Sequence, residues 1–409
     1  MRILYVTSAF PYPLTSGYLR HYFFIRELSQ RGHDITLLAL AGARFEPEHA
    51  AELERYAERV VCVAAHSRGR NRIARAMLRA GSLVGGPGAT RAVRMMRSSI
   101  RRLLAGESFD TVLLAGKAAF AAVEAVGDLP LVADICDAAS MRLRRALRYE
   151  PPERLLLSAI EYAEARRIER EIVRRADRLV FASPRDRDAL VGANEPRAAV
   201  IANGVDLDFW RRSTPELGLD TIILTGVMSY PPNTDAALQL IHEVLPRVKR
   251  SVPGAKLLIV GRNPSWRLER AAHGPDVELT GYVADIRPYL ERATVFAAPL
   301  RFGAGIQNKV LEAMAMELPA VVSPLVADGI SSANGERAPL HIAAEPDQFA
   351  GLICHELELR RKSFVAQSDS RRFVASHFQW GRSVDKLEEV LTSSVSGPVM
   401  GGRVCSPSR

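Results

Sequence analysis

A glycine-containing turn that opens a helix is the part of this sequence where chemistry is first expected. Gly303 and Gly305 allow the backbone to turn tightly, and mostly strong helix formers follow from Gln307 to Met316. The first turn of such a helix presents unpaired backbone N–H groups and the positive end of the helix dipole, which suit a bound phosphate. Lys309 lies in that turn, where a cation is normally unfavourable, and sharing a polyanion with the N–H groups would offset its cost. The alternative is an ordinary crossover between strands with an incidental lysine.

Three further residues are candidates for contacts with the same ligand. Arg262 follows an apolar run, and its guanidinium can fork onto phosphate oxygens or stack on a base; the alternative is a surface ion pair. Glu312 projects from the same helix face as Lys309, and its carboxylate suits ribose hydroxyls; the alternative is a helical ion pair with that lysine. Gly17 lies in a proline-rich loop and can place its backbone N–H against a ligand, unless this is a plain strand-to-helix connection.

No arrangement typical of a hydrolase or a metalloenzyme accompanies these residues. Neither a Ser/His/Asp nor a Cys/His set stands out. The four cysteines lie far apart in the sequence: Cys62, Cys136, Cys354 and Cys405. Without a Cys-x-x-Cys pair or ligand-spaced histidines they indicate reduced thiols in the cytoplasm, and we expect no metal and no cofactor. Asp134, Asp137 and Ser140 follow another apolar run and are either helix caps or contacts for a second substrate.

Strand-length apolar runs alternate with helical patterns along the chain. The first series of strands is expected at Arg2–Thr7, Asp34–Leu40, Arg59–Ala64, Thr111–Leu114, Leu131–Asp134, Arg178–Ala182 and Ala199–Ile201. The second is expected at Thr221–Gly226, Lys256–Val260, Val277–Thr280, Val295–Ala298, Ala320–Ser323 and Leu340–Ile342. Near-continuous apolar strands separated by helices indicate parallel sheets covered on both faces. We therefore expect an α/β chain with two doubly wound, Rossmann-like domains, and a ligand in the cleft at the carboxyl ends of their strands.

Length and composition agree with this organisation. A chain of 409 residues, 47% hydrophobic and 25% charged, is expected to form about two or three ordinary globular domains. We place the first domain at 1–210 and the second at 211–375. A C-terminal helix at about 376–392 is expected to pack back on the first domain, and the Ser-, Gly- and Pro-rich tail 393–409 to be disordered. Since no run reaches about 18 uncharged apolar residues, we expect no transmembrane helix.

The net charge of +9 is concentrated outside the second domain. From Thr214 to Ala375 there are 17 basic and 18 acidic residues, so the remainder has a balance of +10. A segment between His66 and Gly106 has no acid and carries an arginine patch: Arg68, Arg70, Arg72, Arg75, Arg79, Arg94, Arg97 and Arg101, with Arg91 and Arg102. Interleaved apolar residues make it amphipathic, which suits an anionic membrane surface; the alternative is a solvated arginine-rich helix face. Nucleic acid is not expected, because aromatic residues are nearly absent there.

Several motifs, in this order and spacing, carry a family resemblance. They are Met1–Val6, Ser16-Gly17, Val200–Asp206, Ile259–Pro264, Leu279–Val283 and Lys309–Ala315. With them the chain resembles the retaining nucleotide-sugar glycosyltransferases of the GT-B fold, glycosyltransferase family four. Gly226–Asp235 is similar to a bacterial sugar-transferase subgroup associated with polysaccharide export. The match covers nearly the whole chain.

The resemblance implies a donor site and two substrates. Lys309 would bind the donor diphosphate and share its catalytic stabilisation with Arg262, while Glu312 would bind the ribose. The remaining donor contacts would be Gly17, Val283 and the loop of Gly303, Gly305, Ile306, Gln307 and Asn308. The partners would be a nucleotide sugar and an acceptor glycan, glycolipid or small molecule. We favour a lipid-linked acceptor at the inner face of the cell membrane, from the arginine patch.

Three departures from the family pattern keep other functions open. Ala304 stands where a glutamate is usual, Gly226–Asn233 lacks the usual Arg and Lys, and Leu113–Gly116 lacks a histidine that many members carry. A catalytically silent nucleotide-sugar binding protein would fit the first of these. A sugar-nucleotide epimerase also uses two such domains, although no dedicated acid/base cluster is evident for it.

Overall fold

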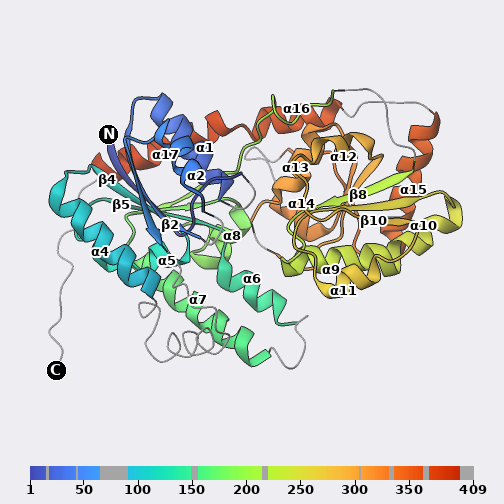
Figure 1. The fold of residues 1–409 in the computed structure, drawn as a ribbon, viewed down its shortest axis with the longest axis horizontal. Helices are drawn as coiled ribbons and strands as arrows, with labels where there is room; N and C mark the ends of the chain where they lie inside the picture. The colour runs from blue at the N-terminus through green and yellow to red at the C-terminus, as the bar shows by residue number, and fades with distance from the viewer. Residues whose placement is uncertain are drawn as a thin grey trace.

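The two predicted series of strands form two lobes. The computed structural model describes residues 1–14, 18–42, 45–64, 91–148, 155–213, 220–303, 305–330, 336–362 and 368–396. Within these residues two parallel sheets lie side by side, each with helices packed around it (Figure 1). Every predicted strand is present, and its ends lie within two residues of those expected from the sequence.

The sheet of the first lobe has seven strands in the order β3-β2-β1-β4-β5-β6-β7. Their bounds are β1 Arg2–Thr7, β2 Asp34–Ala41, β3 Arg59–Ala64, β4 Thr111–Ala115, β5 Leu131–Cys136, β6 Arg178–Phe181 and β7 Ala198–Val200. All neighbours pair in parallel, with Ile3 beside Ile35 on one side and Thr111 on the other. The order reverses at β1 and β4, and at such a switch point parallel sheets open a binding crevice.

Helices cover both faces of this sheet because successive strand residues point to opposite faces. Leu4 and Val6 face the core beneath α4 (Arg91–Gly106) and α7 (Leu155–Arg175), whereas Ile3 and Tyr5 face α1 (Leu19–Gln30) and α17 (Trp380–Ser396). The other elements of the lobe are α2 Pro47–Glu54, α5 Lys117–Phe120, η1 Val123–Ala125, α6 Ala139–Ala146 and α8 Pro184–Leu190. The expected doubly wound architecture is confirmed.

The sheet of the second lobe has six strands in the order β10-β9-β8-β11-β12-β13. Their bounds are β8 Thr221–Thr225, β9 Lys256–Val260, β10 Val277–Leu279, β11 Val295–Ala298, β12 Ala320–Val322 and β13 His341–Ile342. The helices are α9 Pro231–Gln239, a π-helical turn η3 Leu240–Val244, α10 Leu245–Ser251, α11 Trp266–Ala271, α12 Arg287–Arg292, α13 Asn308–Ala315, α14 Pro324–Gly329, α15 Pro346–Lys362 and α16 Ser368–His377. One continuous apolar core joins them.

The chain passes between the lobes twice, and the two passages lie side by side. At the first passage, Val205 N–H donates to the carbonyl of Phe378 at 2.7 Å. A Cβ atom at Gly204 would lie 2.3 Å from the backbone nitrogen of Trp380, so only glycine allows this approach. The Trp380 ring stacks on Phe23 of α1 at 4.7 Å between centroids, which fixes α17 on the first lobe.

The C-terminal helix extends further than the sequence indicated. It runs from Trp380 to Ser396, so the first residues of the expected disordered tail are helical and that prediction is wrong for them. Arg178 explains the extension, because its guanidinium donates to the Oγ and carbonyl oxygens of Ser393. The remainder of the tail, 397–409, lies outside the described residues, and the domain boundaries at 210 and 375 stay a prediction. No helix in the described part of the chain is long and apolar enough to cross a membrane.

Candidate functional site

The glycine turn and its helix form as predicted at the carboxyl end of β11. Gly303 and Gly305 have φ angles of 153° and 68°, in the region that favours glycine. α13 then starts at Asn308; the side chain of Gln307 does not cap it, and its first turn holds no acid. No acidic side chain in this turn therefore offsets the partial positive charge of its backbone N–H groups, and an anionic ligand can bind to them.

Lys309 is anchored above the loop that follows β8. Its Nζ atom donates to the side-chain oxygen of Asn233, whose Nδ2 atom donates to the carbonyl of Val227 at 3.1 Å. Burial lowers the pKa of Lys309 to about 8, against an opposing effect of Glu312. The hydrogen bond to Asn233 holds the amino group of Lys309 at the start of the helix.

Glu312 lies one turn further along α13. Burial raises the pKa of its carboxyl to about 7, and Lys309 acts in the opposite direction. Two partly buried groups that titrate near neutral pH on one helix face are typical of functional sites, because their charges are stabilised only when a ligand arrives. This favours a binding role over a simple structural ion pair.

The loops after β8 and β9 meet beside Lys309. The N–H of Met228 donates to the carbonyl of Arg262 at 2.9 Å, so Arg262 lies at the carboxyl edge, as expected. A Cβ atom at Gly261 would lie 1.7 Å from the carbonyl oxygen of Gly226. Two glycines therefore permit this backbone contact, which brings the loops together. Val283, after β10, and Ile306 are partly buried against the core of the same lobe.

The first lobe holds the glycine turn from the opposite side. Gly305 N–H donates to Oδ2 of the buried Asp186 at 3.0 Å. Arg185 donates to the carbonyls of Leu325 at 2.8 Å and of Gly305 at 3.3 Å. These residues could not be singled out from the sequence, because Ser183 and Asp186 have the spacing of a helix cap, and Ser183 does accept from Asp186 N–H. We conclude that the backbone of Gly305 is positioned by α8 in this conformation.

The two acidic residues at the end of β5 and just after it have different roles. Asp134 is buried and accepts from Nε of Arg20 at 2.7 Å, so it is structural. Asp137 faces the other lobe: a Cβ atom at Gly305 would lie 3.4 Å from its Cβ. Burial raises the pKa of Asp137 to about 6, while Arg142, 3.9 Å away, lowers it. A carboxyl group thus lies opposite the glycine turn.

A chain of hydrogen bonds connects this buried ion pair to α13. Arg20 also donates to the side-chain oxygen of Asn203 at 2.8 Å. Asn203 in turn donates from Nδ2 to the side-chain oxygen of Asn308 at 2.8 Å. Since Asn203 belongs to the first passage between the lobes, the start of the candidate phosphate-binding helix is tied to the first sheet.

The loop after β4, which lacks the histidine that many members carry, is closely packed at Gly116. Gly116 has a φ angle of 88°, and a Cβ atom there would lie 2.7 Å from Oγ of Ser8 and 3.0 Å from the hydroxyl of Tyr18. No larger side chain fits this position without displacing the loop after β1. Gly116 therefore allows the loops after β1 and β4 to pack closely against each other.

The arginine patch is only partly described. The apolar side chains Val93, Met96, Ile100 and Leu103 of α4 are buried in the first lobe. Arg97 donates to the carbonyl of Ala121 at 2.8 Å. Arg94 and Arg101 are exposed. The apolar face of α4 is therefore covered by the sheet and is not open to a membrane. Whether its exposed arginines contact an anionic membrane surface or are a solvated face stays a prediction.

Some of the predicted residues lie outside the described residues. These are Gly17, Ala304 and the patch members Arg68, Arg70, Arg72, Arg75 and Arg79. The contacts expected of them remain predictions.

Family models match both lobes of the chain. A model described as "Glycosyl transferase 4-like domain" matches residues 23–204, and one described as "Glycosyl transferases group 1" matches residues 220–358. The chain belongs to the GT-B glycosyltransferases. Membership of family four is consistent with both matches, and the glycosyltransferase carries Lys309 and Glu312 within the second of them.

Solved structures confirm the fold of this glycosyltransferase. HepE of Anabaena, in complex with UDP and glucose, is 15% identical and aligns over 96% of this chain and 100% of that chain with a TM-score of 0.65. Sucrose-phosphate synthase of Thermosynechococcus elongatus is 12% identical, over 96% and 99%, with a TM-score of 0.71. A glycosyltransferase of Rickettsia africae is 13% identical, over 97% and 99%, with a TM-score of 0.63. No curated protein matches the sequence.

Proposed function

We propose that this glycosyltransferase moves a sugar from a nucleotide-diphosphate sugar to an acceptor hydroxyl, with retention of the anomeric configuration. The observation that carries the proposal is the position of Lys309. It lies in the uncapped first turn of α13, at the strand edge where the loops after β8 and β9 meet. HepE, which has the same fold, was solved with UDP-glucose.

The donor is proposed to lie across the carboxyl ends of the second sheet. The diphosphate would contact Lys309, Arg262 and the N–H groups that open α13, and the ribose would bind Glu312. The loop from Gly303 to Asn308 and the backbone of Val283 would border the sugar and the base. Gly17 would complete the site from the first lobe.

Catalysis is proposed to depend on stabilising the leaving group. The bond between the anomeric carbon and the phosphate oxygen breaks, the acceptor oxygen bonds to the same carbon from the same face, and the departing phosphate takes the acceptor proton. Lys309, Arg262 and the N–H groups would stabilise the departing charge, and removing one such group costs about 10²–10³ in rate. We assign no cofactor and no metal to these steps.

Asp137 is proposed to supply a carboxylate that the second lobe lacks at position 304. Asp137 lies opposite Gly305, and burial raises the pKa of its carboxyl group to about 6. Hydrogen bonds donated by a ligand would stabilise the charged form of this group. Hydroxyl groups of the transferred sugar or of the acceptor would donate these hydrogen bonds to the Asp137 carboxylate.

The acceptor is proposed to be a glycan or glycolipid of bacterial polysaccharide synthesis at the cytoplasmic face of the membrane. The subgroup motif Gly226–Asp235 and the exposed arginines of α4 support this assignment. Since the apolar face of α4 is covered, these arginines would attract an anionic membrane surface through their charge alone.

Incubating the protein with a panel of nucleotide sugars and measuring nucleotide release tests the proposal. Release with at least one donor is expected, and NMR of the product should show an unchanged anomeric configuration. An isomerised donor without release would instead indicate an epimerase. Donor binding with neither outcome would indicate a silent binding protein.

A further inference from the structure

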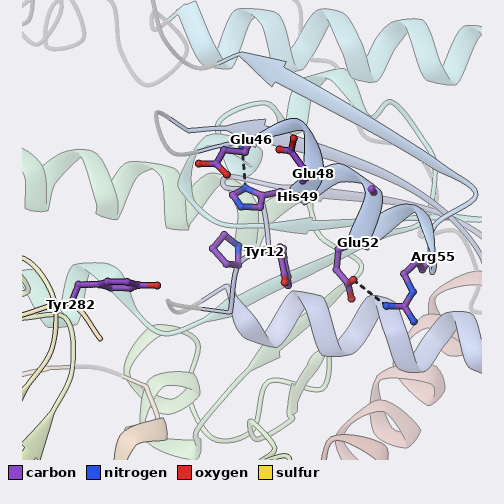
Figure 2. Close-up of a pocket in the computed structure, with 9 residues that line it drawn as sticks. Tyr12, Glu46, Glu48, His49, Glu52, Arg55 and Tyr282 are labelled. Atoms are coloured by element: carbon purple, nitrogen blue, oxygen red, sulfur yellow. Dashed lines mark hydrogen bonds and ion pairs between the residues drawn. The ribbon is translucent and has the colours of Figure 1, made fainter. Parts of the chain in front are cut away.

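A second site opens between the lobes and is not lined by the glycine turn or by Lys309. This cavity of about 600 Å³ is lined by Tyr12 from the loop after β1, by α2 and its flanking residues, and by Tyr282 from the second lobe (Figure 2). Its volume falls within the range of small-molecule sites, about 300–1,000 Å³. The cavity adjoins the proposed donor site, because Tyr282 immediately precedes Val283.

Two tyrosine rings face this cavity from opposite lobes. Tyr282 is 68% exposed and extends toward the first lobe. Tyr12 is held in place by an edge-on contact with His49 at 5.6 Å between centroids and by Tyr22 at 6.0 Å. Each ring combines an apolar face with a polar hydroxyl, which suits a flat ligand whose faces are apolar and whose rim is polar.

The polar groups of the cavity are fixed by their neighbours. His49 Nδ1 accepts from the backbone N–H of Glu46 at 3.1 Å, so the proton of the neutral ring is on Nε2, a donor. Glu52 accepts from the hydroxyl of Tyr22 at 2.7 Å and from Nη1 of Arg55 at 3.2 Å. Donors and acceptors held in this way are pre-organised for hydroxyl groups.

The charge of the cavity is opposite to that of the whole chain. Three glutamates and one arginine line it, a formal balance of −2 in a protein of +9. A cavity with an excess of one sign repels ligands of the same sign and attracts ligands of the opposite sign, whereas neutral ligands enter it without this electrostatic cost. Glu48 lies on the exposed side of α2 and contributes one of these carboxylates.

We propose that this cavity binds the acceptor through a polyhydroxylated ring that carries no negative charge, either neutral or amine-bearing. This inference rests on the proposed function and specifies its acceptor class. A lipid-linked acceptor would then place its anionic phosphate elsewhere, and its sugar ring here.

Binding of methyl glucoside, methyl glucosaminide and methyl glucuronide to the full-length protein, measured by NMR saturation transfer and titration, tests the inference. These probes share a ring and differ in charge. We expect the neutral and amine-bearing glycosides to bind about tenfold or more tightly than the glucuronide. Tyr282→Ala should abolish binding, with Tyr282→Phe as the matched control that retains it, and Glu48→Lys should reduce the preference against the glucuronide.

Equal or tighter binding of the glucuronide would overturn the inference, as would an absence of binding by all three glycosides or unchanged binding in Tyr282→Ala. Nucleotide release from the panel of donors, measured with the same protein preparations in the presence and in the absence of the glycosides, reports the proposed function separately. Release without the predicted glycoside binding rejects only the acceptor class. No release from any donor rejects the proposed function itself.

Discussion

The side-chain amide of Asn203 donates to the side-chain oxygen of Asn308 at 2.8 Å, and this bond joins the first lobe to the first residue of α13. Asn203 is buried and also accepts from Arg20. The orientation of the candidate phosphate-binding helix is thus linked to an ion pair inside the other lobe. A small misplacement of such a helix is costly, because catalysis depends on the position of its N–H groups.

A double-mutant cycle between these two residues is expected to show coupling. Asn203→Ala and Asn308→Ala should each lower kcat/KM for the donor, and the double variant should lose less than the sum, by about 0.5–1.5 kcal/mol. Steady-state kinetics of the four proteins measures this. Strictly additive losses would show that the hydrogen bond does not position the helix.

The pH dependence of donor use should follow Lys309. Its pKa is lowered to about 8, so in the free enzyme the ammonium loses its proton as the pH rises through 8, and kcat/KM should fall on that side. Below pH 8 the amino group of Lys309 is charged, so kcat/KM should no longer be reduced by its deprotonation. In Lys309→Arg, the guanidinium stays charged, so the alkaline limb should move to higher pH. An unchanged limb in that variant would assign the titration to another group.

The close approach of the loops after β8 and β9 should make Gly261 irreplaceable. Gly261→Ala would place a Cβ atom 1.7 Å from the carbonyl of Gly226, so the loops must separate and donor affinity should fall. Gly274→Ala is the matched control, since its φ of 151° resembles the 156° of Gly261 and nothing lies within 4 Å of the added atom. We expect Gly261→Ala to cost about 1–3 kcal/mol more in unfolding experiments. Equal costs would contradict the predicted contact.

Asp137→Asn should separate stability from activity. The raised pKa of Asp137 means that the folded protein favours its protonated form. Ionisation of this carboxyl group therefore destabilises the fold fully above pH 6, and this cost fades as the pH falls from 6 to the ordinary value of 3.8. The amide avoids the cost, so the melting temperature should rise most at pH 8, less at pH 5 and not at all below about pH 3.8. Turnover should fall at both pH values. A variant with full turnover would remove Asp137 from the proposed site.

The sequence allowed the fold to be predicted, and it singled out the candidate residues of the donor site, because both depend on local patterns. Near-continuous apolar runs such as Lys256–Val260 identify buried parallel strands, and the order of glycines, Lys309 and Glu312 identifies a helix start. The contact of Asp186 with Gly305 could not be predicted, since it joins residues 119 positions apart and its local spacing is that of a cap. The amphipathic pattern of α4 is equally compatible with a sheet and a membrane, and only the structure distinguishes them.

In the proposed site, Lys309 binds and stabilises the donor diphosphate. The most direct test measures nucleotide release by wild type and Lys309→Ala with the donor that the panel identifies. We predict a loss of about 10²–10³ in turnover, with a folded variant of unchanged secondary structure. Unchanged kinetics in Lys309→Ala would contradict the proposed site.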